Sequence, residues 1–405
     1  MKKIILALSA ALAVIGNAYA QNEVGEYIDG IYYESYIDRY NGNEYAAVAY
    51  GEYPDGYPES DIIIPKTVTL NGKNLEVKRI NAGALDWVVY KNVRHITLPD
   101  GLISINECAI GSPMPNEEYA RTVSVDLPES IETLYDACLC STIIKEDLNL
   151  PNIRSIGPMT LGDTPIKKLT LGGNLSSVGW MAFVGADIEE LIFEDGNHTD
   201  YFNGMKPYLS NGAFDGMKIK ELKLPKWNNM AIGDCVAADC PQLERVVFPD
   251  IPYFEYGYSN YGYINVDLIM GIYGYFFKDC PNLHEVVCLG MEPPAILGLE
   301  DFASVDVLRY NGCQTFEFMD NIDNCILKVP AGSEQAYRND PVWGKFKTIL
   351  GFENGDYTSI SSVPSADSND AAPVYYNLQG IKVSNPTKGQ LYIRTIGSKA
   401  EKVIF

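Results

Sequence analysis

A short apolar motif recurs along the chain, and this repetition constrains the fold more than any other feature. Each copy reads approximately L-x-x-L-x-L and is closed by Pro or Gly. Between copies a second element recurs, as in "IRSIGPMTLG" and "LSSVGWMAFVG". The copies follow a basic unit of about 22 residues, lengthened in places by insertions. Nine segments carry the motif: 92–101, 122–130, 145–152, 166–174, 188–196, 219–226, 243–250, 283–290 and 325–332.

The size of this unit determines how its leucines can be buried. A single turn of about 22 residues cannot enclose its own apolar side chains, so turns must stack and share one core. The sequence therefore predicts a β-rich leucine-rich-repeat solenoid of about nine turns, with a parallel sheet and capped ends. We expect residues 61–352 to form one elongated domain rather than several globular ones.

Two copies match a known repeat family closely. "GWMAFVGADIEEL" and "VAADCPQLERVVFP" resemble the BspA-like leucine-rich repeats of secreted bacterial proteins. The stretches beginning "SDIIIPKTVTL" and "CILKVPAGSEQAY" resemble the entry and closing segments of that family. The resemblance covers roughly residues 60–352. It implies a binding or adhesive surface rather than a reaction.

The N-terminal part divides into two segments. Residues 1–20 have two lysines, an apolar run and small residues before Gln21, which is the pattern of a secretory signal peptide. We therefore expect an exported protein, secreted or at the cell surface, with the periplasm as the alternative. Residues 21–60 are rich in tyrosine around the turn signal Asn41-Gly42-Asn43, which predicts a β-hairpin. The hairpin is expected to cap the first sheet edge; a second binding patch is the alternative.

The C-terminal part contains three more segments. After Pro330-Ala331-Gly332, Ser333 is the expected N-cap of a short helix. Residues 353–373 form a polar linker. Residues 374–405 predict a small β-module that resembles the sorting domain of Bacteroidota proteins exported by type IX secretion, a resemblance carried by "YNLQG" and "KGQLYI". A β-module without a targeting role is the alternative. Its expected strands are 374–378, 381–383, 391–395 and 402–405.

The charge of the chain limits its partners. The formal net charge is −22 at pH 7, so nucleic acid and anionic lipid are repelled and are not expected as partners. After the first segment, no run approaches the ~20 apolar residues that a membrane span needs. We expect a monomer that binds an extracellular protein or glycan.

Catalytic signals are weak. The three histidines have no neighbour in the sequence that indicates a metal pair or a catalytic base, and HExxH, GxSxG, P-loop and GxGxxG motifs do not occur. We therefore predict no enzyme, no catalytic residues, no metal and no cofactor. A cryptic glycan-active enzyme stays open, because its two carboxylates can be far apart in sequence.

The cysteines favour a structural role. Cys240 and Cys280 occupy a C-x-x-L position that packs inside the turn in the family resembled, and Cys288 ends a strand as a small apolar residue. Cys313 and Cys325 flank an insertion and are the candidate disulfide pair.

The outward positions of the repeat strands carry charge. In parallel register they stack as Lys168, Glu190, Glu221, Arg245 and Glu285 in one row. Lys167, Glu189, Lys220, Glu244 and His284 form the other row. We interpret both rows as a solvated sheet face that avoids like-charge repulsion between neighbouring strands.

One insertion stands out by composition. Residues 251–277 exceed what a turn needs and begin "IPYFEYGYSNYGYIN". Glycine, serine and asparagine interrupt the aromatics, which favours a loop. Tyrosine-rich loops suit contact because Tyr gives area at low entropic cost; a loop packed on the repeat flank is the alternative. The predicted binding residues are Tyr253, Phe254, Tyr256, Tyr258, Tyr261 and Tyr263.

These observations favour a non-enzymatic, exported leucine-rich repeat protein that mediates binding or adhesion to a host or other extracellular protein or glycan. A structural envelope scaffold without a specific ligand is the alternative.

Overall fold

The computed structural model covers the 405-residue chain. The structure describes residues 25–51, 59–85, 93–111, 123–144, 147–196, 207–227, 231–233, 235–251, 253–256, 276–297, 319, 321–353, 355–357, 374–377, 382–383, 386–388, 390–396 and 399–404.

A strand forms in each of the nine predicted repeat segments. They are β7 (His95–Thr97), β9 (Ser124–Asp126), β12 (Asp147–Leu150), β14 (Pro165–Leu171), β16 (Asp187–Phe193), β18 (Glu221–Lys223), β20 (Arg245–Phe248), β22 (Glu285–Cys288) and β24 (Ile326–Pro330). The strand predictions are confirmed. Strands such as β12 alternate inward apolar with outward polar side chains, as a strand with one buried face does.

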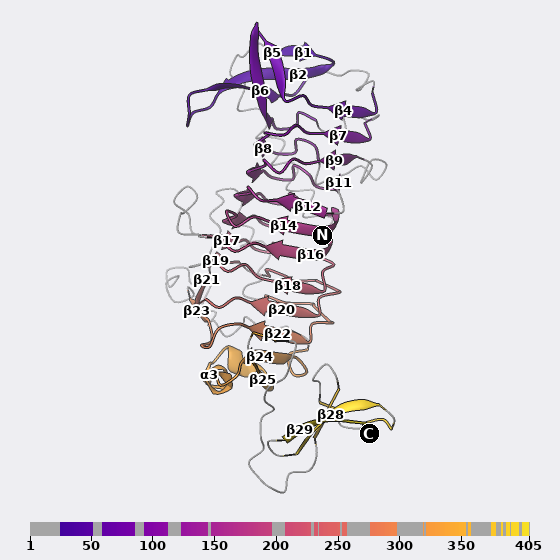
Figure 1. Ribbon diagram of the computed structural model, residues 1–405, viewed down its shortest axis with the longest axis vertical. Coiled ribbons are helices and arrows are strands. Elements are labelled where there is room, and N and C mark those ends of the chain that lie inside the picture. The colour runs from indigo at the N-terminus through magenta and orange to yellow at the C-terminus, as the bar shows by residue number, and fades with distance from the viewer. Residues whose placement is uncertain are drawn as a thin grey trace, which may run out of the picture.

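These strands pair in parallel with their counterparts in neighbouring repeats. Three further strands join them: β4 (Asp61–Ile63), β11 (Ile143–Ile144) and β25 (Thr348–Phe352). The pairing orders are β11-β9-β7-β4, β12-β14-β16 and β18-β20-β22-β24-β25. Figure 1 shows the three sheets following one another down one side of the molecule. We call this succession the first ladder.

A second ladder runs down the opposite side (Figure 1). Its strands correspond to the recurring second element of the sequence and mostly have two residues. They are β6 (Lys73–Ile80), β8 (Ser104–Ile105), β10 (Thr133–Leu134), β13 (Ser155–Ile156), β15 (Ser177–Val178), β17 (Tyr208–Leu209), β19 (Ala231–Ile232), β21 (Tyr253–Tyr256) and β23 (Ala295–Leu297). They pair in parallel in that order.

Tight turns after the second-ladder strands add a third set of backbone bonds between repeats. Met159 N–H donates to the carbonyl of Trp180 at 3.0 Å, and Leu161 N–H donates to that of Ala182 at 2.8 Å. Among the described residues, five of these turns hold two left-handed residues four positions apart, with φ between 49° and 67°. Non-glycine residues at such positions are strained, so the hydrogen bonds between turns must offset that cost. Examples are the pairs Met159 and Asp163, Met181 and Gly185, Gly212 and Gly216, and Cys235 and Asp239.

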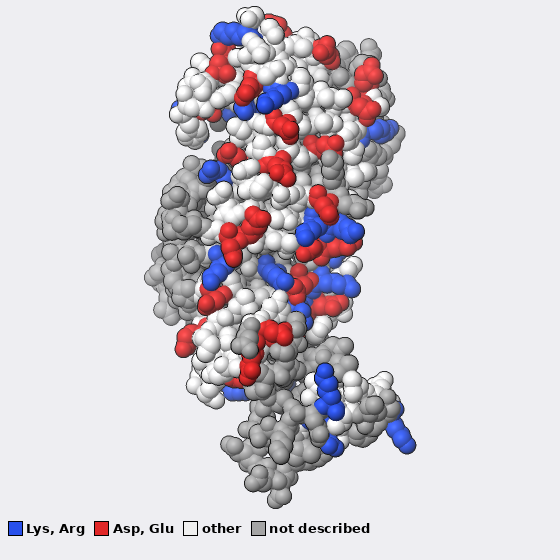
Figure 2. All heavy atoms as spheres, viewed as in Figure 1, with Lys and Arg blue, Asp and Glu red and all other residues white. Residues whose placement is uncertain are grey.

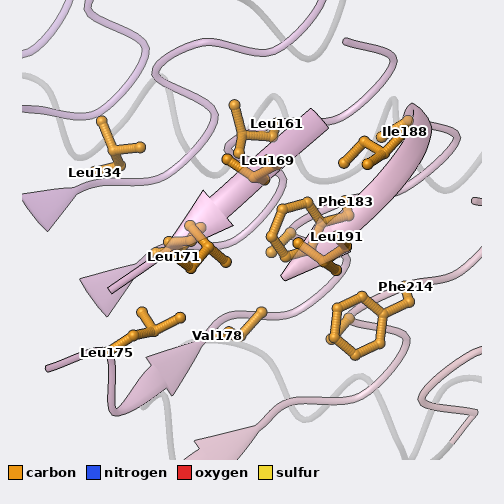
Figure 3. Close-up of a cluster of buried hydrophobic side chains, with 14 of the residues drawn as sticks. Leu134, Leu161, Leu169, Leu171, Leu175, Val178, Phe183, Ile188, Leu191 and Phe214 are labelled. Carbon is orange, nitrogen blue, oxygen red and sulfur yellow. The ribbon is translucent and has the colours of Figure 1, made fainter. Parts of the chain in front are cut away.

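The core lies between the two ladders and is built from equivalent side chains of successive repeats. Figure 3 shows part of it, with leucines of β14 and β16 beside the rings of Phe183 and Phe214. Those two rings stack with their centroids 5.5 Å apart. Both are fully buried, so each turn completes the core of its neighbour.

Antiparallel strands begin the second-ladder sheet. β1 (Glu26–Ile28), β2 (Ile31–Ile37) and β3 (Glu44–Val48) pair antiparallel, and β3 then pairs in parallel with β6. The predicted hairpin at Asn41-Gly42-Asn43 is confirmed. β5 (Thr67–Leu70) pairs antiparallel with β6, and Figure 1 shows these strands at one end of the molecule.

A short helical segment follows the last repeat. α3 (Glu334–Asn339) starts after Ser333, which sits at the N-cap but makes no side-chain cap bond. The predicted N-cap position of Ser333 is confirmed, but its hydroxyl donates to the carbonyl of Pro330 at 2.7 Å instead of capping the helix. The 3-10 helix η2 (Trp343–Lys345) follows, and its Trp343 ring packs edge-on against Phe248 with centroids 5.1 Å apart.

The last strands form a separate antiparallel sheet. β26 (Val374–Tyr376), β27 (Lys382–Val383), β28 (Leu391–Ile396) and β29 (Lys399–Ile404) pair in the order β27-β26-β28-β29. The four predicted strands are confirmed.

Close stacking of the turns predicts a strong effect of one added methyl group. A Cβ at Gly179 would lie 2.5 Å from the backbone carbon of Gly157 and the backbone nitrogen of Pro158. Gly179→Ala should lower the free energy of unfolding by roughly 3 kcal/mol or more, because rigid backbone of the preceding turn must move. Urea unfolding followed by circular dichroism measures this.

Gly42→Ala is the matched control. Gly42 has a φ of +72° and nothing within 4 Å of its added Cβ, so its substitution costs only the conformational strain of about 1–2 kcal/mol. Equal losses for the two variants would contradict the stacking argument.

Candidate functional site

The structure divides the predicted aromatic contact residues into two groups. Residues 253–256 form β21, which pairs in parallel with β19 and β23. The expectation of a loop is therefore wrong for Tyr253, Phe254 and Tyr256, whose backbone belongs to the second ladder. Tyr258, Tyr261 and Tyr263 lie outside the described residues. The role of the six residues as a contact surface stays a prediction.

The structure likewise describes only one of the two cysteines of the candidate disulfide. Cys325 carries a free, buried thiol in this structure, and Cys313 lies outside the described residues. Burial raises the pKa of the Cys325 thiol, so little of the reactive thiolate is present. The pairing stays a prediction for oxidised protein.

The outward face of the first ladder has the charge register expected from the sequence. Lys168 lies 3.3 Å from Glu190, Lys220 lies 3.9 Å from Glu244, and Arg245 lies 2.9 Å from Glu221. Figure 2 shows basic and acidic side chains interleaved along this part of the surface. Exposed pairs of this kind each contribute about 0–1 kcal/mol, so they mainly prevent repulsion between strands.

The same face is closed at its C-terminal end, where the expectation of an exposed row is wrong. Glu285 is 3% exposed and Lys328 is 4% exposed, and their charged groups lie 2.8 Å apart. Arg245 bonds the other oxygen of Glu285. Lys328 also donates to the carbonyl of Tyr357 at 2.8 Å.

A small apolar cluster explains this burial. Val247, Val287 and Phe352 pack together on the outward side of the strands, with Tyr357 against them. The segment after β25 therefore folds back over the strand face. This segment buries charged side chains that would otherwise lie on the surface. The buried network contains both acidic and basic groups, because a buried charge without a partner is costly.

The structure brings together a serine, a histidine and an aspartate that the sequence analysis did not connect. His95 Nδ1 lies 2.7 Å from Ser124 Oγ, and His95 Nε2 lies 3.2 Å from Asp126 Oδ2. The residues come from β7 and β9, 29 positions apart for His95 and Ser124, so only strand register could have revealed them.

This cluster lacks the geometry of a nucleophile and its base. Ser124 Oγ donates its proton to the carbonyl of Arg94 at 3.1 Å, so it accepts rather than donates at His95. Thr97 Oγ1 shares His95 Nε2 at 3.2 Å. A catalytic serine must give its proton to the histidine. The arrangement instead joins two strands on their outward face.

Two carboxyl groups on the turns are perturbed. Burial first, and the Glu107 carboxylate second, raise the pKa of Asp136 to about 6. Burial first, and the Asp239 carboxylate second, raise the pKa of Asp215 to about 7. The neighbouring carboxylates belong to adjacent turns, so repetition brings like charges together. Such shifts also occur in catalytic sites, but here stacking accounts for them.

Two absences concern the part of the chain that the structure describes. No group of three or more His, Cys, Asp or Glu side chains there is placed to hold a metal ion. No helix among the same residues is long and apolar enough to cross a membrane.

The parallel ladders, the repeated turns and the leucine-lined core define a leucine-rich repeat protein. The chain matches the BspA type leucine rich repeat region in six copies, over residues 78–206 and 201–284. These copies span more than half of the chain, which belongs to this family. No curated protein is similar enough to count as a match.

Several solved structures are similar at low identity. A leucine-rich repeat protein from Bacteroides ovatus has 13% identity over 75% of this chain and 84% of its own, with a TM-score of 0.31. Pneumococcal vaccine antigen PcpA has 14% identity over 82% of this chain and 100% of its own, with a TM-score of 0.31. A leucine rich cell surface protein from Faecalibacterium prausnitzii has 13% identity over 83% of this chain and 96% of its own, with a TM-score of 0.24.

The raised pKa of Asp215 predicts a pH-dependent stability effect. Its pKa is about 7 in the folded chain against 3.8 for the free group, so between these values the folded state binds more protons and stability falls as pH rises. Asp215→Asn should therefore raise the free energy of unfolding by roughly 1–3 kcal/mol at pH 8 and by almost nothing near pH 4. Urea titrations at the two pH values measure the difference.

Asp195→Asn is the control for this prediction, because Asp195 is exposed. A gain at pH 8 that persists unchanged at pH 4, or that Asp195→Asn reproduces, would show that charge burial at Asp215 is not the cause.

Proposed function

We propose that this protein is a non-enzymatic, exported leucine-rich repeat protein that binds an extracellular protein or glycan, either secreted or at the cell surface. The observation that carries the proposal is the pair of parallel ladders. They hold the outward side chains of successive repeats on a rigid backbone, which gives an extended surface rather than a closed pocket. Export rests on the signal-like segment 1–20.

We propose further that the two ladders are faces of a single right-handed solenoid of about nine turns. The nine repeat strands and the nine parallel strands of the second ladder support this count. Right-handed crossovers are the strong preference for parallel strands. In this proposal, residues 21–60 and the closing segment through 352 cap the two ends, and 353–373 link the repeats to a sorting module at 374–405.

The aromatic segment after β20 is the proposed contact surface. β21 anchors Tyr253, Phe254 and Tyr256 in the ladder, and the other three tyrosines follow directly in sequence. A rigid strand that leads into a tyrosine-rich stretch suits recognition, because tyrosine contributes large contact area at low entropic cost.

A structural envelope scaffold is the second candidate, favoured by the neutralised strand face. Arg245 pairs with both Glu221 and Glu285, so the outward charges of these repeats already have partners within the chain. A scaffold without a specific ligand needs such a self-contained surface.

A binding array of glycans and extracellular matrix proteins separates the two candidates. The mature protein should capture at least one probe, and Tyr258→Ser, Tyr261→Ser and Tyr263→Ser together should lower its affinity at least tenfold, because contact tyrosines often contribute ~2 kcal/mol each. The triple change leaves β21 intact, so the melting temperature should hold.

Tyr50→Ser is the matched control, since Tyr50 is 61% exposed and follows β3, far in sequence from residues 258–263. A triple variant that loses several degrees of melting temperature would make these rings packing residues. Binding to none of the probes on the array would favour the structural scaffold function.

Deletion of residues 374–405 tests the sorting proposal. The deletion removes all of the separate sheet β27-β26-β28-β29, so the repeats should keep their melting temperature while the protein accumulates in a different cell fraction. Cell fractionation with immunodetection measures this in the native host. Unchanged location and amount would make the module a β-domain without a sorting role.

A further inference from the structure

The tip of the N-terminal hairpin extends beyond what closing the sheet requires. Ile31, Tyr33, Ala46 and Val48 are buried and attach the hairpin to the core. Beyond them the strands continue to a turn at residues 38–43, where Arg39 and Tyr40 are exposed. Tyr40 is 78% exposed. The buried part of the hairpin is sufficient to cover the sheet edge, so capping does not explain the exposed tip.

The tip is rigid despite its exposure. Asp38 Oδ1 accepts from the N–H groups of Tyr40 and Asn41 at 2.9 and 3.0 Å. Gly42 N–H donates to the carbonyl of Asp38, and Asp38 N–H donates to that of Asn43, both at 2.8 Å. The backbone that carries Arg39 and Tyr40 is thus ordered by hydrogen bonds before any partner arrives, which lowers the entropic cost of binding.

Tyrosine rings and arginines from the hairpin and the first repeats lie together here. The Arg79 guanidinium is 4.1 Å from the centre of the Tyr36 ring, and that of Arg39 is 4.9 Å from the centre of the Tyr40 ring. The Tyr36 and Tyr45 rings are 6.1 Å apart.

Tyr135, which follows β10, extends this group onto the repeats. Burial and the Glu107 carboxylate raise the pKa of Tyr135, while Arg79 and Arg39 lower it. Strand register supports this grouping, because Arg79 lies opposite Ser104 and Ser104 lies opposite Thr133, so Glu107 and Tyr135 follow neighbouring strands of the second ladder. The Tyr135 ring is 40% exposed. We call Tyr36, Arg39, Tyr40, Arg79, Glu107 and Tyr135 the hairpin cluster.

The hydrogen-bonding groups of the hairpin cluster are largely unused. Among the described residues, neither Arg39 nor Arg79 forms an ion pair with a carboxylate, and Glu107 forms none with a cation. Arg39 uses one N–H on the hydroxyl of Tyr40, at 2.9 Å. Guanidinium donors and a carboxylate acceptor thus surround aromatic faces without satisfying each other.

We propose that the hairpin cluster binds an uncharged polysaccharide. Aromatic faces pack against the C–H face of a sugar ring, while guanidinium and carboxylate groups form strong hydrogen bonds to its hydroxyls. The mixture of both signs suits a neutral ligand, and the net charge of −22 opposes a polyanion. The site depends on the binding role proposed above but is separate from residues 253–263.

The test uses the full mature chain on immobilised neutral polysaccharides: α-glucan, β-glucan, mannan, xylan and galactan. At least one should bind. Its affinity should stay within twofold between about 0.05 and 0.5 M NaCl, because a neutral ligand offers no charge to screen. Hyaluronan and poly-L-glutamate serve as acidic glycan and acidic peptide probes, and neither should bind.

Two variants link binding to the hairpin cluster. Tyr40→Ala changes an exposed side chain, so the fold should persist, and it should weaken binding about tenfold or more, as loss of a contact anchor does. Arg79→Gln should act in the same direction. Arg154→Gln is the control, because Arg154 is paired with Glu132 in the next repeats.

The outcomes of this test distinguish the hairpin cluster from the proposed contact surface at residues 253–263. The inference is supported if a neutral polysaccharide binds and Tyr40→Ala weakens that binding. The triple variant Tyr258→Ser/Tyr261→Ser/Tyr263→Ser should leave the same binding unchanged. The inference is overturned if no neutral polysaccharide binds or if only the acidic probes bind. It is also overturned if Tyr40→Ala keeps wild-type affinity and an unchanged melting temperature. If the 258–263 variant alone abolished binding, the hairpin cluster would fail while the general binding role stood.

Discussion

Every part of the repeat region depends on contact between successive turns. A turn in this chain has two or three short strands and a few apolar side chains, so it cannot exclude water from its own interior. Phe183 is fully buried because the turn carrying Phe214 lies against it. The backbone follows the same rule, since turn N–H groups such as that of Leu161 find their acceptors in the following turn. The stacking of equivalent turns therefore provides both the burial of side chains and the backbone hydrogen bonds.

The sequence predicted the elements that have a strong local pattern. The first-ladder strands were found because their alternation repeats with a closing Pro or Gly, as in β14 and β16. The hairpin at Asn41-Gly42-Asn43 and the four strands of the last module have turn signals of their own. The sequence shows the second ladder as a recurring element but does not predict its strands, because two residues such as Ser177 and Val178 are too few to show a period. The same limit led to the wrong loop assignment of Tyr253–Tyr256, whose aromatic composition concealed a ladder strand.

Side-chain environments were predicted less well, since they depend on segments distant in sequence. Glu285 occupies an outward position, and the strand pattern correctly places it there; its buried partner Lys328 was not part of the predicted rows. They are buried because the chain near Tyr357 returns over them, which no local pattern encodes. The cluster of His95, Ser124 and Asp126 arises in the same way from strand register. The hairpin cluster combines residues from positions 36 to 135, so the sequence showed only that its tyrosines are numerous.

The two ends of the repeat region solve the open-edge problem differently, and this difference affects where a partner can bind. At the C-terminal end, the closing segment covers the core through Trp343, and the chain beyond it also covers the outward strand face at Glu285 and Lys328. At the N-terminal end, the hairpin joins the second ladder through backbone pairing of β3 with β6 and burial of Ile31 and Tyr33. The first solution uses up the outer surface. At the other end, the buried residues lie on the parts of β2 and β3 away from the turn, so the turn at residues 38–43 extends past the closed edge with Arg39 and Tyr40 exposed. An exposed, rigid tip beside an already closed edge can change its side chains at little cost to stability, which is the condition under which a recognition surface evolves on a repeat scaffold.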